Sequence, residues 1–259
     1  MTIRDLYAAL EQRLPRSLSW DWDNDGISCA PDLDAPVTGV LIALDPTEDA
    51  VEAAIEAGAN VLLTHHPMLF RGLKTVDGHD TGSRKVIRMI QNGITAMAIH
   101  TRWAAAAGGV NDCLAAALGL TCIEPFGDAS NPAGKPIGRV GDLPREMTAD
   151  EFIATLKTAL GLPNLIFAGC GKSIRRVAVV GGAGDDDIAA AVAAGADTYV
   201  TGELRYHQLC DAPYGDVNLI MAGHYHTEVP VLDRLAALCG EICPEAPVRV
   251  VKTTLVEVR

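Results

Sequence analysis

The sequence has few aromatic residues and lacks the features typical of membrane proteins or of proteins that bind nucleic acids. Aromatic side chains make up 5% of the 259 residues, and no hydrophobic run reaches the roughly 20 residues that a membrane-spanning helix needs. Lys and Arg together number 21 against 33 Asp and Glu, which gives a net charge of −12. Because phosphate backbones are bound by clustered cations, and no basic stripe occurs, we expect neither a nucleic-acid nor a membrane partner.

A disulfide framework is also missing. The seven cysteines are odd in number and irregularly spaced, and the close pair Cys239 and Cys243 has no second pair at zinc-ribbon spacing. The first residues form an amphipathic helical pattern over 2–14, with Asp5 early in it, rather than the apolar core of a signal peptide. We therefore expect a cytoplasmic protein.

The hydrophobic pattern predicts an α/β fold built from two similar halves. A strand over residues 40–44, a helix capped by Thr47 and a strand over 61–64 form one β-α-β unit. A strand over 177–180, a helix over 185–194 and a strand over 198–201 form another, and Gly195 follows Gly58 by 137 positions. This internal repeat predicts two facing α/β lobes, residues 1–126 and 173–259, with a metal site between them. Residues 127–172 are expected to connect the lobes and to contain a helix over 148–160.

Histidines follow several of these strands. His65 and His66 come directly after the buried run 61–64, where ligands collect at the carboxyl ends of parallel strands. Side chains of neighbouring residues in an extended chain point to opposite faces, so we expect each of these two histidines to bind a different ion of a pair. The alternative is a structural pair of histidines that bond backbone carbonyls. A further apolar strand ends at His100, and another ends at His224. A helix is expected to start near Thr227, which would bring Glu228 close to His224.

Two glycine- and aspartate-rich segments are interpreted as structural. Residues 19–27 contain two tryptophans and several Asp and Asn, which we expect to bond their local backbone in a hydrophobic clasp. Residues 181–184 follow a strand as phosphate-binding glycines do, but three aspartates come next. Because carboxylates at a helix N-terminus repel phosphate, no phosphate site is expected there.

Several motifs together resemble the GTP cyclohydrolase 1 type 2 homologues, also called the interacting-factor-3-like proteins. The resemblance extends over nearly the whole chain. It is carried by Trp22-Asp23-Asn24-x-Gly26, Thr64-His65-His66-Pro67, His100-Thr101, Gly108-Gly109-Val110-Asn111-Asp112, Gly138-Arg139-Val140-Gly141, Thr201-Gly202-Glu203 and Gly223-His224-x3-Glu228.

The resemblance implies a metal centre and an assembly. It implies that His65, His66, His224 and Glu228 bind one or two divalent ions per chain, either zinc, iron or manganese. It also implies a toroidal homo-hexamer. The family's remaining aspartate ligand is replaced here by Ala104. The residues that could replace this aspartate as a ligand are Asp112, Glu203, His207 and His226. For each of them, an ordinary structural role is the alternative.

Two functions remain open at this stage. One is a metal-dependent hydrolase acting on a nucleotide-like small molecule, with the metal activating water and Glu228 as the candidate catalytic side chain. The resemblance implies GTP as the substrate, for which Arg71, Arg102 and Arg205 are the candidate phosphate partners. The other function is a non-catalytic metal-binding scaffold or regulatory protein, which the loss of the aspartate at position 104 favours.

Overall fold

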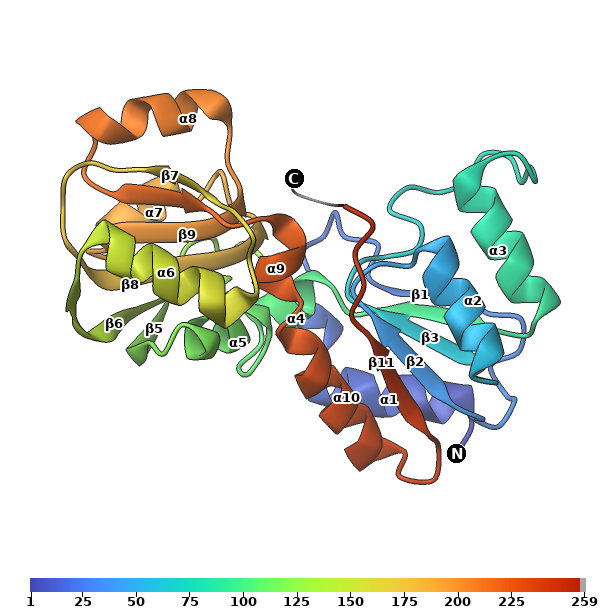
Figure 1. Ribbon diagram of the computed structural model, residues 1–259. Coiled ribbons are helices and arrows are strands. Elements are labelled where there is room, and N and C mark those ends of the chain that lie inside the picture. The colour runs from blue at the N-terminus through green and yellow to red at the C-terminus, as the bar shows by residue number, and fades with distance from the viewer. Residues whose placement is uncertain (257–259) are drawn as a thin grey trace. The chain divides into compact units, whose positions relative to one another are not determined.

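The computed structural model describes residues 1–256 and divides the chain into two compact units (Figure 1). Unit 1 comprises Met1–Trp103 and Leu232–Thr253, and unit 2 comprises Ala104–Val231 with residues 254–256. The chain therefore leaves unit 1 within α4 (Thr101–Ala105) and returns to it at α10 (Val231–Ile242).

The core of unit 1 is a five-stranded sheet in the order β1-β4-β3-β2-β11. Its strands are β1 (Gly26–Cys29), β2 (Val40–Ala43), β3 (Val61–Thr64), β4 (Thr95–Ala98) and β11 (Val248–Val251). All pairs are parallel except β1 with β4. Every residue of β2, β3 and β4 is buried, as expected for parallel strands covered on both faces. Thr64 is in register with Ala43 and Ala98, so these three strands end at the same edge.

Helices cover this sheet, and the first two of them begin where the sequence predicts. They are α1 (Ile3–Arg13), α2 (Glu48–Glu56), α3 (Thr81–Gln91) and α10, with the 3-10 turn η1 (Arg16–Leu18) after α1. Thr2 and Thr47 accept hydrogen bonds from the first helical turns of α1 and α2. These caps satisfy backbone N–H groups that have no partner within the helix.

Unit 2 contains a six-stranded sheet in the order β5-β6-β8-β9-β10-β7. Its strands are β5 (Thr121–Phe126), β6 (Gly138–Met147), β7 (Ile166–Ala168), β8 (Ile174–Ala183), β9 (Thr198–Glu203) and β10 (Asn218–Met221). Strands β8, β9 and β10 are parallel, and the others pair antiparallel. The expected α/β fold class is thus confirmed, with one sheet in each unit.

The helices of unit 2 pack on both faces of its sheet. They are α5 (Val110–Ala117), α6 (Ala149–Leu160), α7 (Ile188–Ala193), α8 (Tyr206–Asp211), the 3-10 turn η2 (Ala212–Tyr214) and α9 (His224–Glu228). Val177 and Val179 of β8 share a core with α5 and α6, whereas Ala178 and Val180 share one with α7. This alternation follows from the two-residue period of a strand. Within residues 127–172, the expected helix is α6, which begins with a capping box at Thr148.

Two predicted helix starts are wrong. The helix expected from residue 185 begins at Ile188, and the preceding acids bond Arg205, with Asp185 at 2.6 Å and Asp186 at 3.5 Å. The helix expected from Thr227 begins already at His224, directly after β10. Gly223 has a φ of 82°, a conformation that glycine adopts without strain, and it allows the chain to turn at once from strand to helix.

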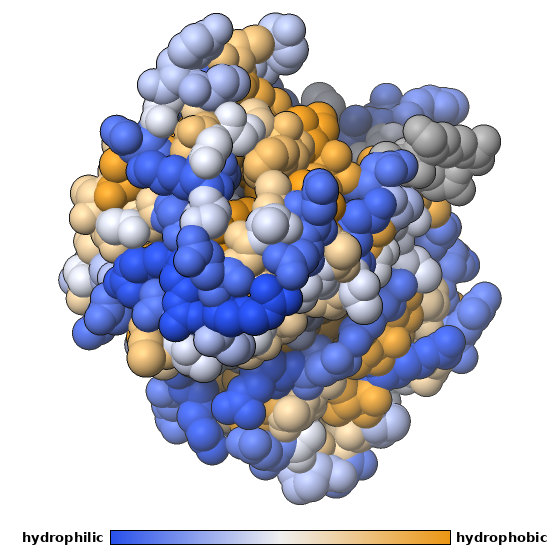
Figure 2. Space-filling view, turned by 60° about the vertical axis from the view of Figure 1, so that its left-hand side comes forward, coloured by the Kyte–Doolittle hydropathy of each residue, from blue (hydrophilic) through white to orange (hydrophobic). Residues whose placement is uncertain are grey.

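The surface of the chain is largely hydrophilic on the face shown in Figure 2, where a broad blue area lies beside smaller orange hydrophobic areas. Within residues 1–256, every helix is either too short or too polar to cross a membrane.

Candidate metal centre

Three histidines of unit 1 converge at the edge where β3 and β4 end. One side-chain ligand atom from each of His65, His66 and His100 lies within 4.8 Å of the others. The ring centroids of His65 and His66 are 4.9 Å apart, and His100 lies 5.2 Å from the first and 5.5 Å from the second. The expectation that His65 and His66 point to opposite faces is wrong. The strand ends at Thr64 and the chain bends at the two histidines, so strand alternation no longer applies.

Each histidine of this cluster is oriented through its Nδ1 atom. Nδ1 of His65 lies 3.0 Å from the carbonyl oxygen of Ile99, that of His66 lies 2.7 Å from Asp45 Oδ1, and that of His100 lies 3.0 Å from Asp23 Oδ1. A metal-binding histidine commonly donates its second ring N–H to a carbonyl or carboxylate, which fixes the tautomer. With Nδ1 engaged in this way, Nε2 is the atom through which each ring would bind a metal.

Asp23 is the most firmly held of these acceptors. Its side chain has no exposed surface, and it also accepts hydrogen bonds from the backbone N of Thr101 at 3.1 Å and from Thr101 Oγ1 at 2.5 Å. Burial raises the pKa of the Asp23 carboxyl, but the hydrogen bonds from His100 and Thr101 outweigh it, so the pKa is lowered. The expectation of purely local bonding in residues 19–27 is therefore wrong, because this carboxylate bonds residues 77 and 78 positions away.

The neighbouring Asp25 holds Arg102. Both side chains are almost completely buried, and Arg102 Nη2 lies 2.8 Å from Asp25 Oδ1. Arg102 also donates from Nη1 to the carbonyl oxygen of Leu14 at 3.0 Å. A guanidinium engaged in this way is part of the core, so the sequence-based suggestion that Arg102 binds phosphate is wrong.

Unit 2 brings His224 and Glu228 together on one turn of α9. His224 Nε2 lies 3.1 Å from Glu228 Oε2, and its Nδ1 lies 2.7 Å from Glu203 Oε1. Residues four apart on a helix share a face, which explains the first contact. The histidine and the acid thus come from one helix rather than from a strand end and a later helix start.

Glycines of β8 and β9 make room for this pair. A Cβ added at Gly182 would meet the Glu228 carboxylate and lie 3.1 Å from His224 Nε2. One added at Gly202 would lie 2.7 Å from the Cα of His224. Gly182, which belongs to the segment that resembles a phosphate loop, and Gly202 of β9 therefore allow the close approach of α9, a role that sequence reasoning missed.

Most of the residues considered as substitutes for the missing aspartate contact other groups of the protein. Asp112 lies 2.6 Å from Arg139 Nε and accepts a hydrogen bond from the backbone of Gly108. Glu203 orients His224, and His226 Nδ1 lies 3.3 Å from the carbonyl oxygen of Leu160. His207 is exposed on α8. Sequence reasoning placed His100 at a strand end but did not propose it as a ligand. Its position after a strand that ends at the same edge as β3 is the signal that could have identified it as a candidate.

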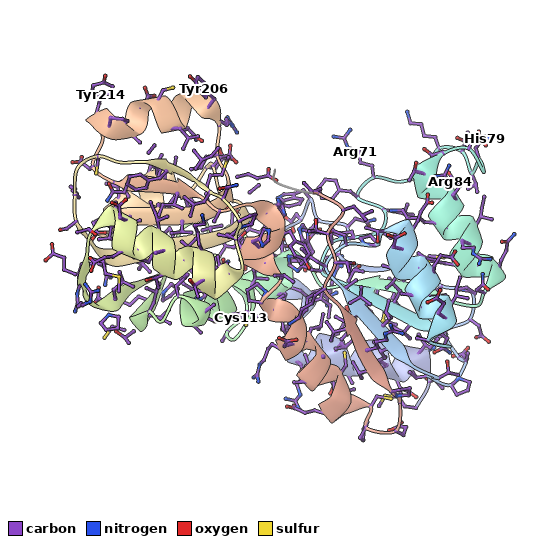
Figure 3. The ribbon with its side chains drawn as sticks, viewed as in Figure 1. Arg71, His79, Arg84, Cys113, Tyr206 and Tyr214 are labelled. Carbon is purple, nitrogen blue, oxygen red and sulfur yellow. The ribbon has the colours of Figure 1, made fainter. Side chains whose placement is uncertain are left out.

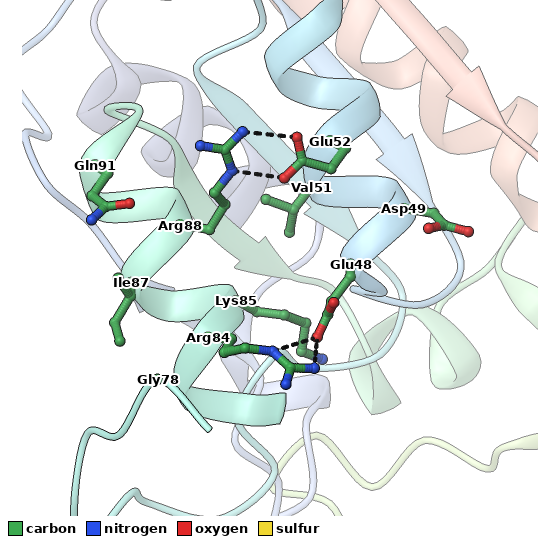
Figure 4. Close-up of a pocket in the computed structure, with 10 residues that line it drawn as sticks. All are labelled: Glu48, Asp49, Val51, Glu52, Gly78, Arg84, Lys85, Ile87, Arg88 and Gln91. Carbon is green, nitrogen blue, oxygen red and sulfur yellow. Dashed lines mark hydrogen bonds and ion pairs between the residues drawn. The ribbon is translucent and has the colours of Figure 1, made fainter. Parts of the chain in front are cut away.

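A separate cavity in unit 1 lies between α2 and α3 and has a volume of about 420 Å³ (Figure 4). Four of its charged side chains form two ion pairs, since Arg84 lies 2.6 Å from Glu48 and Arg88 lies 2.7 Å from Glu52. Lys85 donates to the carbonyl oxygen of Pro46, and burial lowers its pKa. None of the residues that line this cavity belongs to the histidine cluster, so we assign it no part in the metal centre.

The side-chain atoms that could bind a metal in the two units are chemically suited to zinc or another divalent transition metal. Unit 1 offers three imidazoles, and unit 2 offers an imidazole and a carboxylate. Imidazole nitrogen and carboxylate oxygen are ligands that zinc, iron and manganese accept in proteins.

Comparison with known proteins gives a consistent result. The family model of DUF34/NIF3 (NGG1p interacting factor 3) matches residues 1–257. The chain is 36% identical over 239 residues to the GTP cyclohydrolase 1 type 2 homolog of Clostridium perfringens, covering 91% of this chain and 90% of that protein. It is 35% identical over 248 residues to the protein of the same name in Streptomyces coelicolor, covering 93% and 86%.

A solved structure supports the same relationship. The crystal structure of a hypothetical protein of Staphylococcus aureus aligns with a TM-score of 0.91 at 29% identity, covering 100% of this chain and 99% of that one. Because the family model and relatives above 30% identity both span most of the sequence, the chain belongs to the DUF34/NIF3 family.

Proposed function

We propose that the chain binds divalent metal and uses it to hydrolyse a nucleotide-like small molecule. The observation that carries this proposal is the orientation of four histidines, His65, His66, His100 and His224, each through an acceptor at Nδ1. His226 also has a carbonyl oxygen at Nδ1, but the ligand atoms of His65, His66 and His100 converge to within 4.8 Å of one another, and that convergence favours a metal. The names of the curated relatives, GTP cyclohydrolase 1 type 2 homolog, motivate the choice of a nucleotide.

The residues that we propose as ligands are His65, His66, His224 and Glu228, with His100 added from its position beside the first two. Zinc, iron or manganese, one or two ions per chain, would supply a Lewis acid that polarises the substrate and lowers the pKa of water. Glu228 is 5% exposed and its carboxylate contacts His224, so it is our candidate for accepting a proton.

The arginines limit where a phosphate group can be bound. Arg102 is buried against Asp25, and Arg205 lies 2.6 Å from Asp185. We therefore propose Arg71, which is exposed on the loop after β3 and follows His66 by five residues, as the phosphate partner.

A non-catalytic metal-binding scaffold is the second candidate function. Ala104 is a buried alanine on α4, and it stands where the resemblance implies an aspartate ligand. A methyl group provides neither charge nor a lone pair, so a second ion would be bound weakly and hydrolysis that needs two ions would be lost. We also propose a homo-hexamer, for which native mass spectrometry is the test.

The deciding experiment combines metal analysis with a substrate screen. Metal content per chain is measured by elemental analysis, and a panel of nucleotides is then incubated with the zinc-, iron- or manganese-loaded protein. We expect release of formate or phosphate that depends on the metal and is absent in His66→Ala. Stoichiometric metal without turnover of any nucleotide would favour the scaffold, and a protein that binds no divalent metal would contradict both functions.

A further inference from the structure

Two large aromatic side chains of unit 1 are exposed side by side. The ring centroids of Trp22 and Phe70 are 6.0 Å apart with an interplanar angle of 52°, and the residues are 60% and 54% exposed. The other two tryptophans, Trp20 and Trp103, are 8% and 4% exposed. Single exposed aromatic residues are common on protein surfaces, but two in contact form an apolar patch of the kind that often binds a ligand.

The pair borders the histidine cluster. Trp22 packs edge-on against His100, with ring centroids 6.3 Å apart and an interplanar angle of 75°. Trp22 also precedes Asp23, which orients His100, and Phe70 follows His66 by four residues. A flat molecule stacked on Trp22 would therefore lie within reach of the proposed metal ligands.

Hydrogen bonds between loops hold the two rings in place. The Asn24 side-chain amide donates to the carbonyl oxygen of Leu69, which ties the Trp22 loop to the Phe70 loop. The backbone N of Trp20 donates to Thr101 Oγ1 at 3.1 Å, and Thr101 donates to Asp23. The rings are thus positioned before any ligand arrives, which reduces the entropy lost on binding.

We infer that Trp22 and Phe70 bind the planar heteroaromatic ring of a small-molecule ligand by stacking beside the metal centre. This inference rests on the proposed function for the position of the metal. Two aromatic side chains bury about 300–500 Å² together, which is less than the roughly 800 Å² per partner of a stable protein interface. Arg71, adjacent to Phe70, projects away from the ribbon (Figure 3) and supplies a cation for an anionic group on the same ligand.

Tryptophan fluorescence offers a direct test, because Trp22 is the exposed tryptophan. Zinc-loaded protein is titrated with guanosine monophosphate, and in parallel with ribose phosphate, which has no aromatic ring. We expect saturable quenching by the nucleotide and none by the sugar phosphate. Calorimetry should show that Trp22→Ala and Phe70→Ala each weaken nucleotide binding by about 5- to 150-fold, the range typical of base stacking.

Matched variants separate stacking from other effects. Trp22→Phe keeps a ring and should retain most of the affinity, and Tyr214→Ala, which removes an aromatic side chain that is 92% exposed in unit 2, should change nothing (Figure 3). Elemental analysis of each variant should give unchanged zinc. Absence of saturable nucleotide binding to the zinc-loaded protein, or unchanged affinity in Trp22→Ala, would overturn the inference.

Two further readouts distinguish this inference from the proposed function. Nucleotide binding that depends on Trp22 without any hydrolysis would support the stacking site while contradicting the hydrolase. A Trp22→Ala protein with normal nucleotide affinity but a smaller assembly by native mass spectrometry would instead show that the pair is a contact between copies of the chain, and the inference would fail.

Discussion

The two units orient their candidate metal ligands in different ways. In unit 1, His66 and His100 depend on Asp45 and Asp23, which lie 21 and 77 residues away, and the Asp23 side chain has no exposed surface. In unit 2, His224 contacts Glu228 within one helical turn and Glu203, whose side chain is 59% exposed. Unit 1 therefore contains a fully buried carboxylate acceptor, Asp23, whereas Glu203 in unit 2, like Asp45 in unit 1, is partly exposed and can be replaced by water.

The largest effect on stability is expected from breaking the buried ion pair between Asp25 and Arg102 in unit 1. Arg102→Met leaves Asp25 buried without its cation, and we expect a loss of about 3–5 kcal/mol of stability, measured by urea unfolding. The control, Arg205→Met, removes a cation that is 59% exposed and should cost less than about 1 kcal/mol. Equal costs in the two variants would contradict the view that unit 1 depends more on buried polar contacts.

Removal of a proposed ligand should have the next largest effect. We expect His66→Ala to lower zinc affinity by more than about 100-fold, since even loss of an outer partner costs about 10- to 100-fold. His224→Ala should lower zinc affinity less, because the ring is 35% exposed and unit 2 offers fewer candidate ligands than unit 1. His207→Ala, on the surface of α8, is the matched control. Calorimetric zinc titration of the metal-free proteins decides the order, and a normal affinity in His66→Ala would refute the ligand assignment.

Substitution of the carboxylates that accept hydrogen bonds from the histidines tests the same difference between the two units. Asp23→Asn weakens the acceptor of His100, and we expect about a 10- to 100-fold loss of zinc affinity, because water cannot replace a buried carboxylate. Glu203→Gln should change the affinity less, since solvent can reach Nδ1 of His224. Zinc competition with a fluorescent chelator measures both, and circular dichroism checks that Asp23→Asn remains folded. A larger loss in Glu203→Gln would reverse the proposed difference between the units.

The smallest change adds a ligand instead of removing one. Ala104→Asp restores the carboxylate that the family resemblance implies, and we expect the number of tightly bound ions to rise from about one toward two per chain. A buried charge without a partner is costly, so the metal-free variant should melt at a lower temperature than the parent protein, and metal should restore its stability.

Ala106→Asp is the control, because Ala106 is also buried but two positions away from the proposed ligand site. It should be destabilised without binding additional metal. Two equally tight ions in the unmodified chain, measured by elemental analysis and titration, would instead show that the aspartate at position 104 is not needed.

Local chemistry explains why much of the fold follows from the sequence. The apolar runs of β2, β3 and β4, the cap at Thr47 and the position of His65 and His66 at a strand end all depend on residues close together in the chain. The predicted helix starts were less accurate where glycine or acidic residues allow more than one backbone conformation, as at Gly223 and at residues 185–187.

The contacts of the site depend on tertiary structure. The third histidine of the unit 1 cluster, His100, becomes a neighbour of His65 only because β3 and β4 pair in register. Asp23 and Asp45 become acceptors only after the loops that carry them fold against the sheet, and spacing in the sequence does not encode which acid meets which imidazole. The residue types and the strand ends were thus determined by the sequence itself, while hydrogen bonds between residues 21 to 77 positions apart selected the orientation of each ring.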